Sequence, residues 1–281
     1  MTSRRSTERT QCCHVCELER DEARRIQYSL LPGADLKGTS FEVAYRFSPY
    51  AEVGGDFADF FILPNGFIGL YIGDVVGKGL PAAMYAALVM GMLRGIHKTG
   101  QDPVSVLALL NKRLLVRAAS GRYAATLYAL FDPVTLELTF SNAGLPFPLL
   151  SFKEGCKQLG HGGIPIGLFP DSQYVVHSLR LSPGDAVLFA TDGLHELRGV
   201  RDDDFSWERL PEIWRECGKH PAAESLESLF RGVDEFSKGG RQHDDITAVV
   251  LKVPSHNADM ASDSEFPSRA TEQAGSCALH S

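Results

Sequence analysis

Four aspartates each stand at the end of an apolar, strand-like run of this 281-residue chain. The blocks that contain them are Glu52–Asp56, Ile72–Asp74, Ala190–Gly193 and His243–Thr247. Side chains at strand ends lie at the rim of a sheet, where they can converge without being buried inside it. Carboxylates gathered in this way repel one another unless protons or cations intervene. The chain must therefore fold so that this repulsion is relieved, and Mg²⁺ or Mn²⁺ would relieve it because both prefer oxygen ligands.

The clearest local element is a β-hairpin that joins residues 57–63 to residues 67–73 through Pro64-Asn65-Gly66. With Asn65 as the pivot, Asp56 lies nine positions before the turn and Asp74 nine positions after it. In a regular antiparallel pair these two residues face each other across the strands. Local geometry alone therefore predicts that two of the four carboxylates are neighbours.

The remaining pattern predicts a layered α+β domain. Expected helices cover residues 17–31, 81–98, 103–119, 207–217 and 222–237, and expected strands cover 42–47, 123–131, 136–141, 147–152, 174–181, 186–190 and 246–253. Strand clusters with antiparallel hairpins, separated by helix pairs, favour this class over a parallel doubly wound sheet. The charged helix at 17–31 has a thin apolar stripe, so we expect it to dock on the body or on a second copy in a homodimer.

Composition limits the classes of partner. The chain is 44% hydrophobic and has a formal net charge of −7, which gives no general attraction for nucleic acid or an anionic membrane. The longest uncharged apolar stretch, Gly79–Leu93, is too short to span a bilayer and predicts a buried helix. The polar N-terminus lacks the apolar segment of a secretory signal, so we expect a cytoplasmic protein.

We predict three regions along the chain. Residues 1–32 form a polar lead-in and the N-terminal helix, residues 33–253 form one domain, and residues 254–281 form a disordered tail rich in Ser, Ala, Asp and Glu.

The six cysteines are expected to be reduced thiols. An alternative is a structural zinc site, because Cys13-His-Val-Cys16 and Cys217-Gly-Lys-His220 each have the spacing of half a site. Nothing in the sequence brings these halves together, so unpaired thiols are the preferred interpretation.

The candidate metal ligands are all aspartates. They are Asp56, Asp74, Asp192 and Asp244, with Asp59 and Asp245 in reserve. None has a His or Cys beside it in a zinc spacing, which favours Mg²⁺ or Mn²⁺. Asp56 with Asp74 would suit one ion, and Asp74 with Asp192 and Asp244 would suit a second. Two such ions activate water and neutralise phosphate oxygens in an in-line displacement. A single aspartate block of this kind would indicate only a turn. The four blocks together predict a metal-dependent phosphohydrolase.

The same blocks resemble a known family. Residues 52–59 and 73–83 are similar to motifs of the PPM (protein phosphatase 2C-like) phosphatases, in particular the bacterial branch typified by stage II sporulation protein E and the sigma-B regulator phosphatases. Residues 191–194 and 244–247 agree with it, and residues 26–32 resemble the helix ending that usually precedes such a domain. The resemblance covers roughly residues 17–253.

This resemblance implies a sandwich of two antiparallel sheets flanked by helices, with the metal site at one edge. It implies Mn²⁺- or Mg²⁺-dependent removal of phosphate from phosphoserine or phosphothreonine in a protein. In this branch the usual substrate is a STAS-type anti-sigma factor antagonist in a partner-switching pathway.

The resemblance also implies a role for each candidate ligand. Asp56 would hold one metal and Asp74 would bridge both, with the Val75 carbonyl completing the bridged site. The second metal would be held by Asp192 together with Asp244 or Asp245.

The chain departs from eukaryotic relatives in two respects. Val76 stands where they place a candidate proton-donating histidine, and their phosphate-gripping arginine has no evident counterpart. Lys78, His195 and His243 are candidate substitutes, although a structural or solvent-facing role suits each of them as well. Two other functions stay open, a non-catalytic regulator with the same fold and a phosphohydrolase acting on a small molecule.

Overall fold

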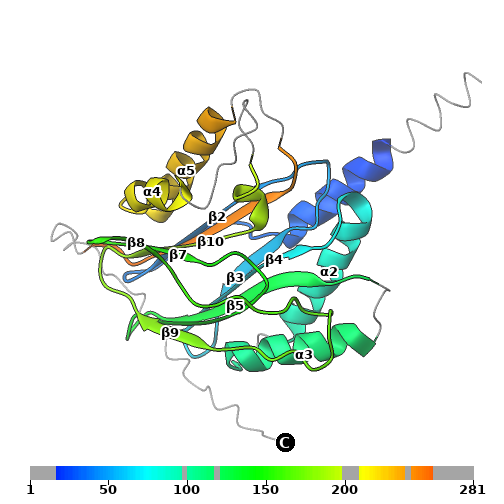
Figure 1. Ribbon diagram of the computed structural model, residues 1–281, viewed down its shortest axis with the longest axis horizontal. Helices are drawn as coiled ribbons and strands as arrows, with labels where there is room; N and C mark the ends of the chain where they lie inside the picture. Colours follow the sequence, from blue (N-terminus) through cyan, green and yellow to red (C-terminus); the bar gives the residue numbers. More distant parts are fainter. Residues whose placement is uncertain (1–16, 97–99, 117–120, 198–208, 238–241, 256–281) are drawn as a thin grey trace, which may run out of the picture.

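The computed structural model describes residues 17–96, 100–116, 121–197, 209–237 and 242–255. Within them, two antiparallel sheets pack face to face and helices cover the outer face of each, as Figure 1 shows. The predicted α+β sandwich is confirmed. The lead-in at 1–16, the tail from 256 onward and four of the six cysteines lie outside the described residues. The other two, Cys156 and Cys217, are free thiols.

The first sheet has six strands, and its central pairings join strands that are distant in sequence. Their spatial order is β1 (Leu36–Lys37), β2 (Glu42–Ser48), β11 (Ile246–Lys252), β10 (Ala186–Ala190), β7 (Leu149–Phe152) and β8 (Gly155–Gln158). β11 lies between β2 and β10, and its seven residues are all buried. Its start therefore lies beside the ends of two strands that come from other parts of the chain.

The second sheet is built mainly from strands that follow one another. Its order is β3 (Phe57–Ile62), β4 (Ile68–Val75), β5 (Ala124–Asp132), β6 (Glu137–Ala143) and β9 (His177–Arg180). The β3–β4 turn has Gly66 at φ 86°, a left-handed conformation that glycine adopts without strain. The register pairs Phe57 with Gly73, so Asp56 and Asp74 stand opposite each other at the next position, as predicted.

Three apolar layers hold the sandwich together. Side chains of both sheets, including Val43, Phe60, Leu70, Phe140 and Val249, form the core between the sheets. α2 (Gly79–Ile96) and α3 (Pro103–Val116) cover the second sheet, and α4 (Arg209–Cys217) and α5 (Ala222–Phe236) cover the first. Burial on both faces explains why strands such as β5 and β11 read as continuous apolar runs.

Helix boundaries follow local chemistry. α3 begins after Asp102, whose carboxylate accepts a hydrogen bond from the Ser105 amide (3.0 Å), as an N-cap residue does. α2 begins at Gly79, two residues before the predicted start, and Pro81 stands in its first turn where no hydrogen bond is lost. No helix in the described part of the chain has the length and apolar character needed to cross a bilayer.

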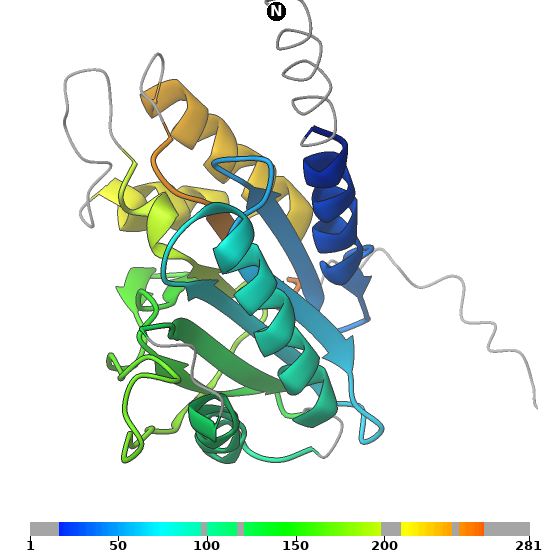
Figure 2. The same cartoon turned by 90° about the vertical axis from the view of Figure 1, so that its right-hand side faces the viewer.

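The N-terminal helix, residues 17–30, docks on the body of the molecule beside β2 and α2 (Figure 2). The Tyr28 ring contacts the Phe47 ring with centroids 5.8 Å apart, and the Arg94 guanidinium donates to the Leu30 carbonyl (2.6 Å). The first of the two predicted docking modes is therefore confirmed. A contact with a second copy stays a prediction.

The strand prediction is wrong in several places. β1 and β8 were not expected, because they are short segments without alternation. The strand expected at 174–181 is reduced to β9 at 177–180. These segments lie at the margins of the two sheets, where tertiary context decides the conformation more than the sequence pattern does.

Candidate active site

Five aspartates lie at one edge of the sandwich, and we call this group the acidic edge: Asp56, Asp74, Asp192, Asp244 and Asp245. Each is placed by a strand end. Asp56 directly precedes β3, and Asp74 is the penultimate residue of β4. Asp192 follows β10 and opens a short 3₁₀ helix, η2 (Asp192–Leu194). The last two directly precede β11. The structure thus brings together every aspartate of the four sequence blocks.

Asp56 joins the two sheets. Its side chain is only 1% exposed, and its carboxylate accepts hydrogen bonds from the hydroxyls of Thr191 (2.8 Å) and Thr247 (2.7 Å). Thr191 directly follows β10 and Thr247 lies in β11, so both threonines come from the first sheet. Asp56, in contrast, directly precedes β3 of the second sheet. A buried carboxylate that accepts two hydroxyl hydrogen bonds has a fixed orientation.

Burial and mutual repulsion raise the pKa values of four of these carboxyl groups, those of Asp56, Asp74, Asp192 and Asp245. Burial raises the pKa of Asp74 to about 7, with further contributions from the charges of Asp192 and Asp244. Burial and the charges of Asp74 and Asp245 hold the pKa of Asp56 well above its ordinary value. The pKa of Asp192 is raised by burial and then by other carboxylates. Such an edge attracts cations strongly, because a bound cation would remove the repulsion that now favours protonation.

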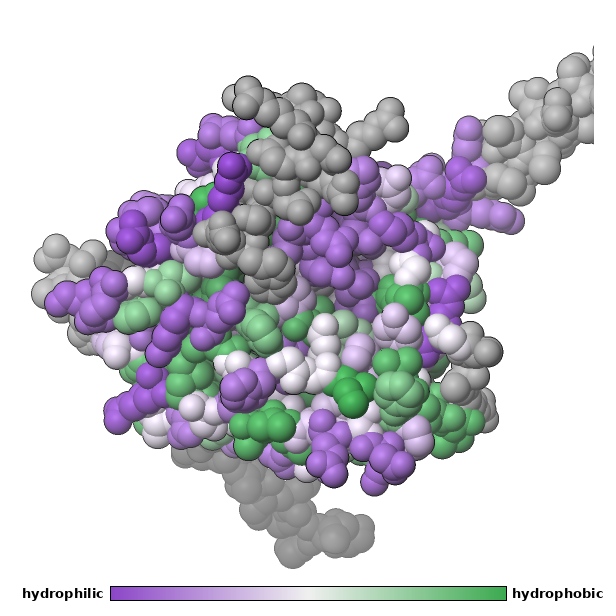
Figure 3. All heavy atoms as spheres, viewed as in Figure 1, coloured by the Kyte–Doolittle hydropathy of each residue, from purple (hydrophilic) through white to green (hydrophobic). Residues whose placement is uncertain are grey.

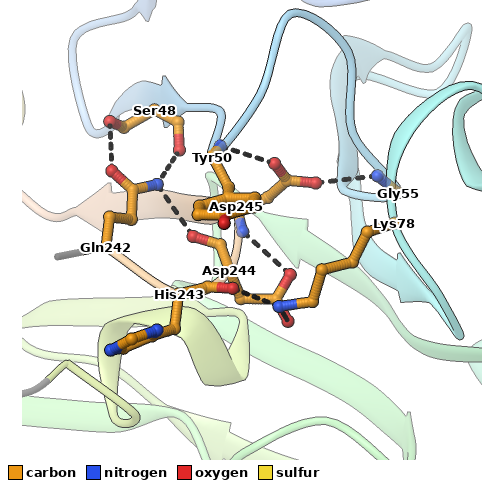
Figure 4. Close-up of polar contacts among 8 residues, drawn as sticks. All are labelled: Ser48, Tyr50, Gly55, Lys78, Gln242, His243, Asp244 and Asp245. Atoms are coloured by element: carbon orange, nitrogen blue, oxygen red, sulfur yellow. Dashed lines mark hydrogen bonds and ion pairs between the residues drawn. The ribbon is translucent and has the colours of Figure 1, made fainter.

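The two aspartates that precede β11 have different surroundings, which Figure 4 shows. Asp245 is 5% exposed, and its carboxylate accepts hydrogen bonds from the backbone amides of Tyr50 (2.8 Å) and Gly55 (2.8 Å). Asp244 is more accessible and forms an ion pair with the Lys78 ammonium (2.7 Å). Asp245 therefore holds the loop before Asp56, while Asp244 faces the open side of the edge.

The three candidate substitutes for an arginine are placed very differently. The Lys78 ammonium lies at the acidic edge, where it also donates to the His243 carbonyl. His243 is exposed and its ring points away from the aspartates in Figure 4. His195 is 7% exposed, and burial lowers the pKa of its imidazole to about 4, so it is neutral at physiological pH. Of these three residues, only Lys78 brings a positive charge to the acidic edge.

Asp59 does not lie at the acidic edge, so its place as a reserve ligand is wrong. Its carboxylate accepts hydrogen bonds from the Arg94 guanidinium (2.8 and 3.0 Å) and from the Tyr71 hydroxyl (3.1 Å). It lies three residues after Asp56, and side chains alternate along a strand, so the two point to opposite faces. Asp59 therefore faces α2, whereas Asp56 faces the other sheet.

The donor chemistry of the edge fits a hard divalent metal. A Cβ built on Gly55 would lie 2.8 Å from the Val75 carbonyl oxygen and 3.1 Å from Asp74 Oδ1, so these two oxygens converge on a point that only glycine leaves free. Carboxylate and carbonyl oxygens are the ligands that Mg²⁺ and Mn²⁺ prefer. Within the described residues, no three Asp, Glu, His or Cys side chains already form a closed ligand set. Hydroxyl, amide and ammonium donors engage the carboxylates instead.

Close packing behind the acidic edge predicts that a side chain added at Gly193 destabilises the fold. A Cβ added at Gly193 would lie 1.9 Å from the backbone oxygen of Asp245, and a backbone atom cannot move aside as a flexible side chain can. We expect Gly193→Ala to lower the free energy of unfolding by about 1–3 kcal/mol, as overpacking does. Chemical denaturation of both proteins measures this. Gly155→Ala is the matched control, since nothing lies within 4 Å of its added Cβ. Equal stability of the two variants would contradict the prediction.

Two residues of the site were quoted in the sequence motifs but given no role, namely Thr191 and Thr247. The register of β10 and β11 pairs Ala190 with Ala248, which places these threonines opposite each other. The Thr247 amide donates to the Thr191 hydroxyl (3.0 Å), and both hydroxyls reach Asp56. The signal was a threonine within two positions of an aspartate in both motifs, but their partner could not be inferred without the strand pairing.

The chain matches the protein family described as stage II sporulation protein E (SpoIIE) over residues 64–254. Among curated proteins, the chain is 26% identical to protein IcfG of Synechocystis over 265 residues, which cover 84% of this chain and 42% of that protein. It is 25% identical to the phosphoserine phosphatase RsbU of Bacillus subtilis, covering 82% of this chain and 68% of RsbU. The chain thus spans less than half the length of the first relative and about two thirds of the second.

Solved structures share the fold. The SiaA-PP2C domain of Pseudomonas aeruginosa superposes with a TM-score of 0.76 at 21% identity, covering 86% of this chain and 98% of that one. RsbX, solved in complex with magnesium, superposes with a TM-score of 0.59 at 15% identity, covering 78% of this chain and 98% of RsbX. At these identities the likeness concerns the arrangement of the two sheets and their helices.

Proposed function

Because the chain belongs to the SpoIIE family of PP2C-type phosphatases, we propose that it is a metal-dependent phosphatase that removes phosphate from phosphoserine or phosphothreonine in a protein. The acidic edge is the observation that carries the proposal. Its five carboxylates come from four strand ends. The pKa values of Asp56, Asp74, Asp192 and Asp245 are raised by burial and by a repulsion that divalent cations would relieve.

We assign the residues of the edge as follows. Asp56 and Asp74, with the Val75 carbonyl, would hold one Mn²⁺ or Mg²⁺ ion. Asp74, Asp192 and Asp244 would hold a second. Such a pair of ions supplies charge neutralisation for the phosphate oxygens and lowers the pKa of the attacking water. The magnesium complex of RsbX supports a hard divalent metal in this fold.

Other side chains would orient the ligands and the substrate. Thr191 and Thr247 fix the Asp56 carboxylate, and Asp245, given above as an alternative ligand, instead holds the loop at Tyr50 and Gly55. The Lys78 side chain is 49% exposed, so its ammonium would be able to bind a phosphate oxygen if a metal neutralised Asp244.

A surface beside the edge favours a protein substrate over a small phosphoester. Ile166 exchanges backbone hydrogen bonds with Ala124 (3.0 and 2.9 Å), which pairs in turn with Val75. Two large apolar side chains that follow Ile166 closely in the chain, those of Leu168 and Phe169, are exposed. Apolar residues also gather in the lower part of the face in Figure 3, over α3 and β9. A nucleotide or sugar phosphate would leave such a surface uncovered, whereas a protein would cover it.

We further propose that the substrate is a phosphorylated STAS-domain antagonist of an anti-sigma factor. RsbU, a named phosphoserine phosphatase, supports the phosphoserine chemistry, and the exposed apolar surface supports a folded partner.

The test is phosphate release by the purified chain with Mn²⁺, from a phosphoserine-bearing STAS protein, a phosphoserine peptide and a nucleotide. We expect release from the STAS protein, slower release from the peptide, none from the nucleotide and none with EDTA. Preference for the nucleotide would instead support a small-molecule phosphohydrolase. Tight binding of the phosphoprotein without turnover would support a non-catalytic regulator.

A further inference from the structure

The helix ending at residues 26–32 was singled out by its sequence, and one of its side chains reaches the loop that leads to Asp56. The Gln27 side chain is buried, with 8% exposed, although its neighbours on the helix face solvent. Its amide nitrogen donates to the Gly54 carbonyl (2.8 Å), and its amide oxygen accepts from the Gly54 amide (3.1 Å). One side chain thus satisfies both backbone groups of one loop residue, as a neighbouring strand would do.

The other side of the same loop is held by β11. The amides of Tyr50 and Gly55 donate to the two carboxylate oxygens of Asp245, each at 2.8 Å. Gly54 therefore lies between Gln27 of the N-terminal helix and Asp245 of the acidic edge. Asp56 comes two residues later, so a shift of this loop would move a candidate ligand directly.

The remaining contacts of the helix do not replace this one. Tyr28 contacts Phe47 and Leu30 accepts from Arg94, but neither contact touches the loop. Arg20 does reach the loop, through an ion pair with Glu52 (3.6 Å), but both side chains are exposed, and exposed ion pairs contribute little. Between the helix and α2 lies an apolar groove lined by Ile26, Leu30 and Met84, among others, and Asp56 lies at its wall. The helix is thus only partly packed against α2 at this point, and the hydrogen bonds of Gln27 form its buried connection to the loop.

We propose that Gln27 is a positioning residue for the metal site, because its amide fixes the Gly54–Asp56 segment from the side opposite Asp245. The inference rests on the proposed metal-dependent function. Its consequence is that metal affinity depends on the seating of the N-terminal helix, although no residue of that helix is a metal ligand.

The test is a titration of the purified full chain with Mn²⁺, in which isothermal titration calorimetry measures the Kd. Gln27→Met keeps the length of the side chain but removes both hydrogen bonds to Gly54, and we expect its Kd for Mn²⁺ to rise about tenfold. Gln27→Glu can still accept from Gly54 but cannot donate to it, so we expect a smaller rise. Arg25→Met, an exposed substitution on the same helix, should bind Mn²⁺ like the wild type.

Two further readouts separate positioning from a general loss of stability. Hydrogen exchange at the Gly54 and Gly55 amides should accelerate in Gln27→Met, while amides of β5 keep their protection. Saturating Mn²⁺ should restore most of the turnover. If Gln27→Met does not fold, the Kd of Gln27→Glu decides. An unchanged Mn²⁺ affinity in the folded variants would overturn the inference, whereas failure of the wild type to bind Mn²⁺ would overturn the proposed function itself.

Discussion

Replacing Asp74 with asparagine is expected to abolish Mn²⁺-stimulated phosphate release, by at least about a thousandfold, while leaving the fold intact. Asp74 is the carboxylate with the most acidic neighbours, since Asp56, Asp192, Asp244 and Asp245 all influence its pKa. In the proposed site it serves both ions, and an amide oxygen cannot supply the charge that each needs. The measurement is steady-state phosphate release from a phosphoserine protein, with circular dichroism to verify the fold.

The matched control is Asp234→Asn, which makes the same chemical change at an exposed position on α5. It should retain wild-type turnover. Asp192→Asn should resemble Asp74→Asn, because Asp192 is assigned to the second ion. Near-normal activity in either edge variant would refute the assigned site.

The sequence predicted the local half of this site because turn chemistry sets a register. Pro64-Asn65-Gly66 fixes the hairpin, and the hairpin fixes Asp56 opposite Asp74. The same alternation was sufficient to exclude Asp59, since an odd separation from Asp56 places the two side chains on opposite faces.

The long-range half depends on strand pairing that no local pattern specifies. β11 lies between β2 and β10, and only this order brings Thr247 beside Thr191 and both beside Asp56. The contact between Gln27 and Gly54 likewise spans 27 residues and requires the helix to be docked. Family resemblance supplied the convergence of the four motifs, whereas the residues that orient the ligands became evident only from the packed structure.

The raised pKa values predict a second large effect, which is a pH dependence of the stability of the metal-free protein. The pKa of Asp74 is about 7 in the fold and ordinarily 3.8. Between these values the folded protein binds more protons than the unfolded chain, so stability falls as pH rises. The contribution is fully present below about pH 4 and is lost as pH rises through about 7. The full difference corresponds to at most about 4 kcal/mol.

Asp74→Asn removes this titration. The difference in melting temperature between the variant and the wild type should therefore depend on pH and on the presence of metal. Without metal at pH 8, we expect the variant to melt several degrees above the wild type, because a repelled charge is gone. The difference should shrink as pH falls to 5, where wild-type Asp74 is itself protonated. Buried His195 also titrates in acid, since burial lowers its pKa to about 4, but it is common to both proteins and cancels in the comparison.

Mn²⁺ should reverse the order at pH 8. Binding to the folded state raises the melting temperature of the wild type, since the ions then compensate the repulsion among Asp56, Asp74 and Asp192. Asp74→Asn should gain little, because its site lacks the shared ligand. Differential scanning fluorimetry at pH 5, 6, 7 and 8, with EDTA or Mn²⁺, measures all these quantities. If metal-free Asp74→Asn is less stable than the wild type at pH 8, the prediction that repulsion among the carboxylates of the acidic edge destabilises the fold is wrong.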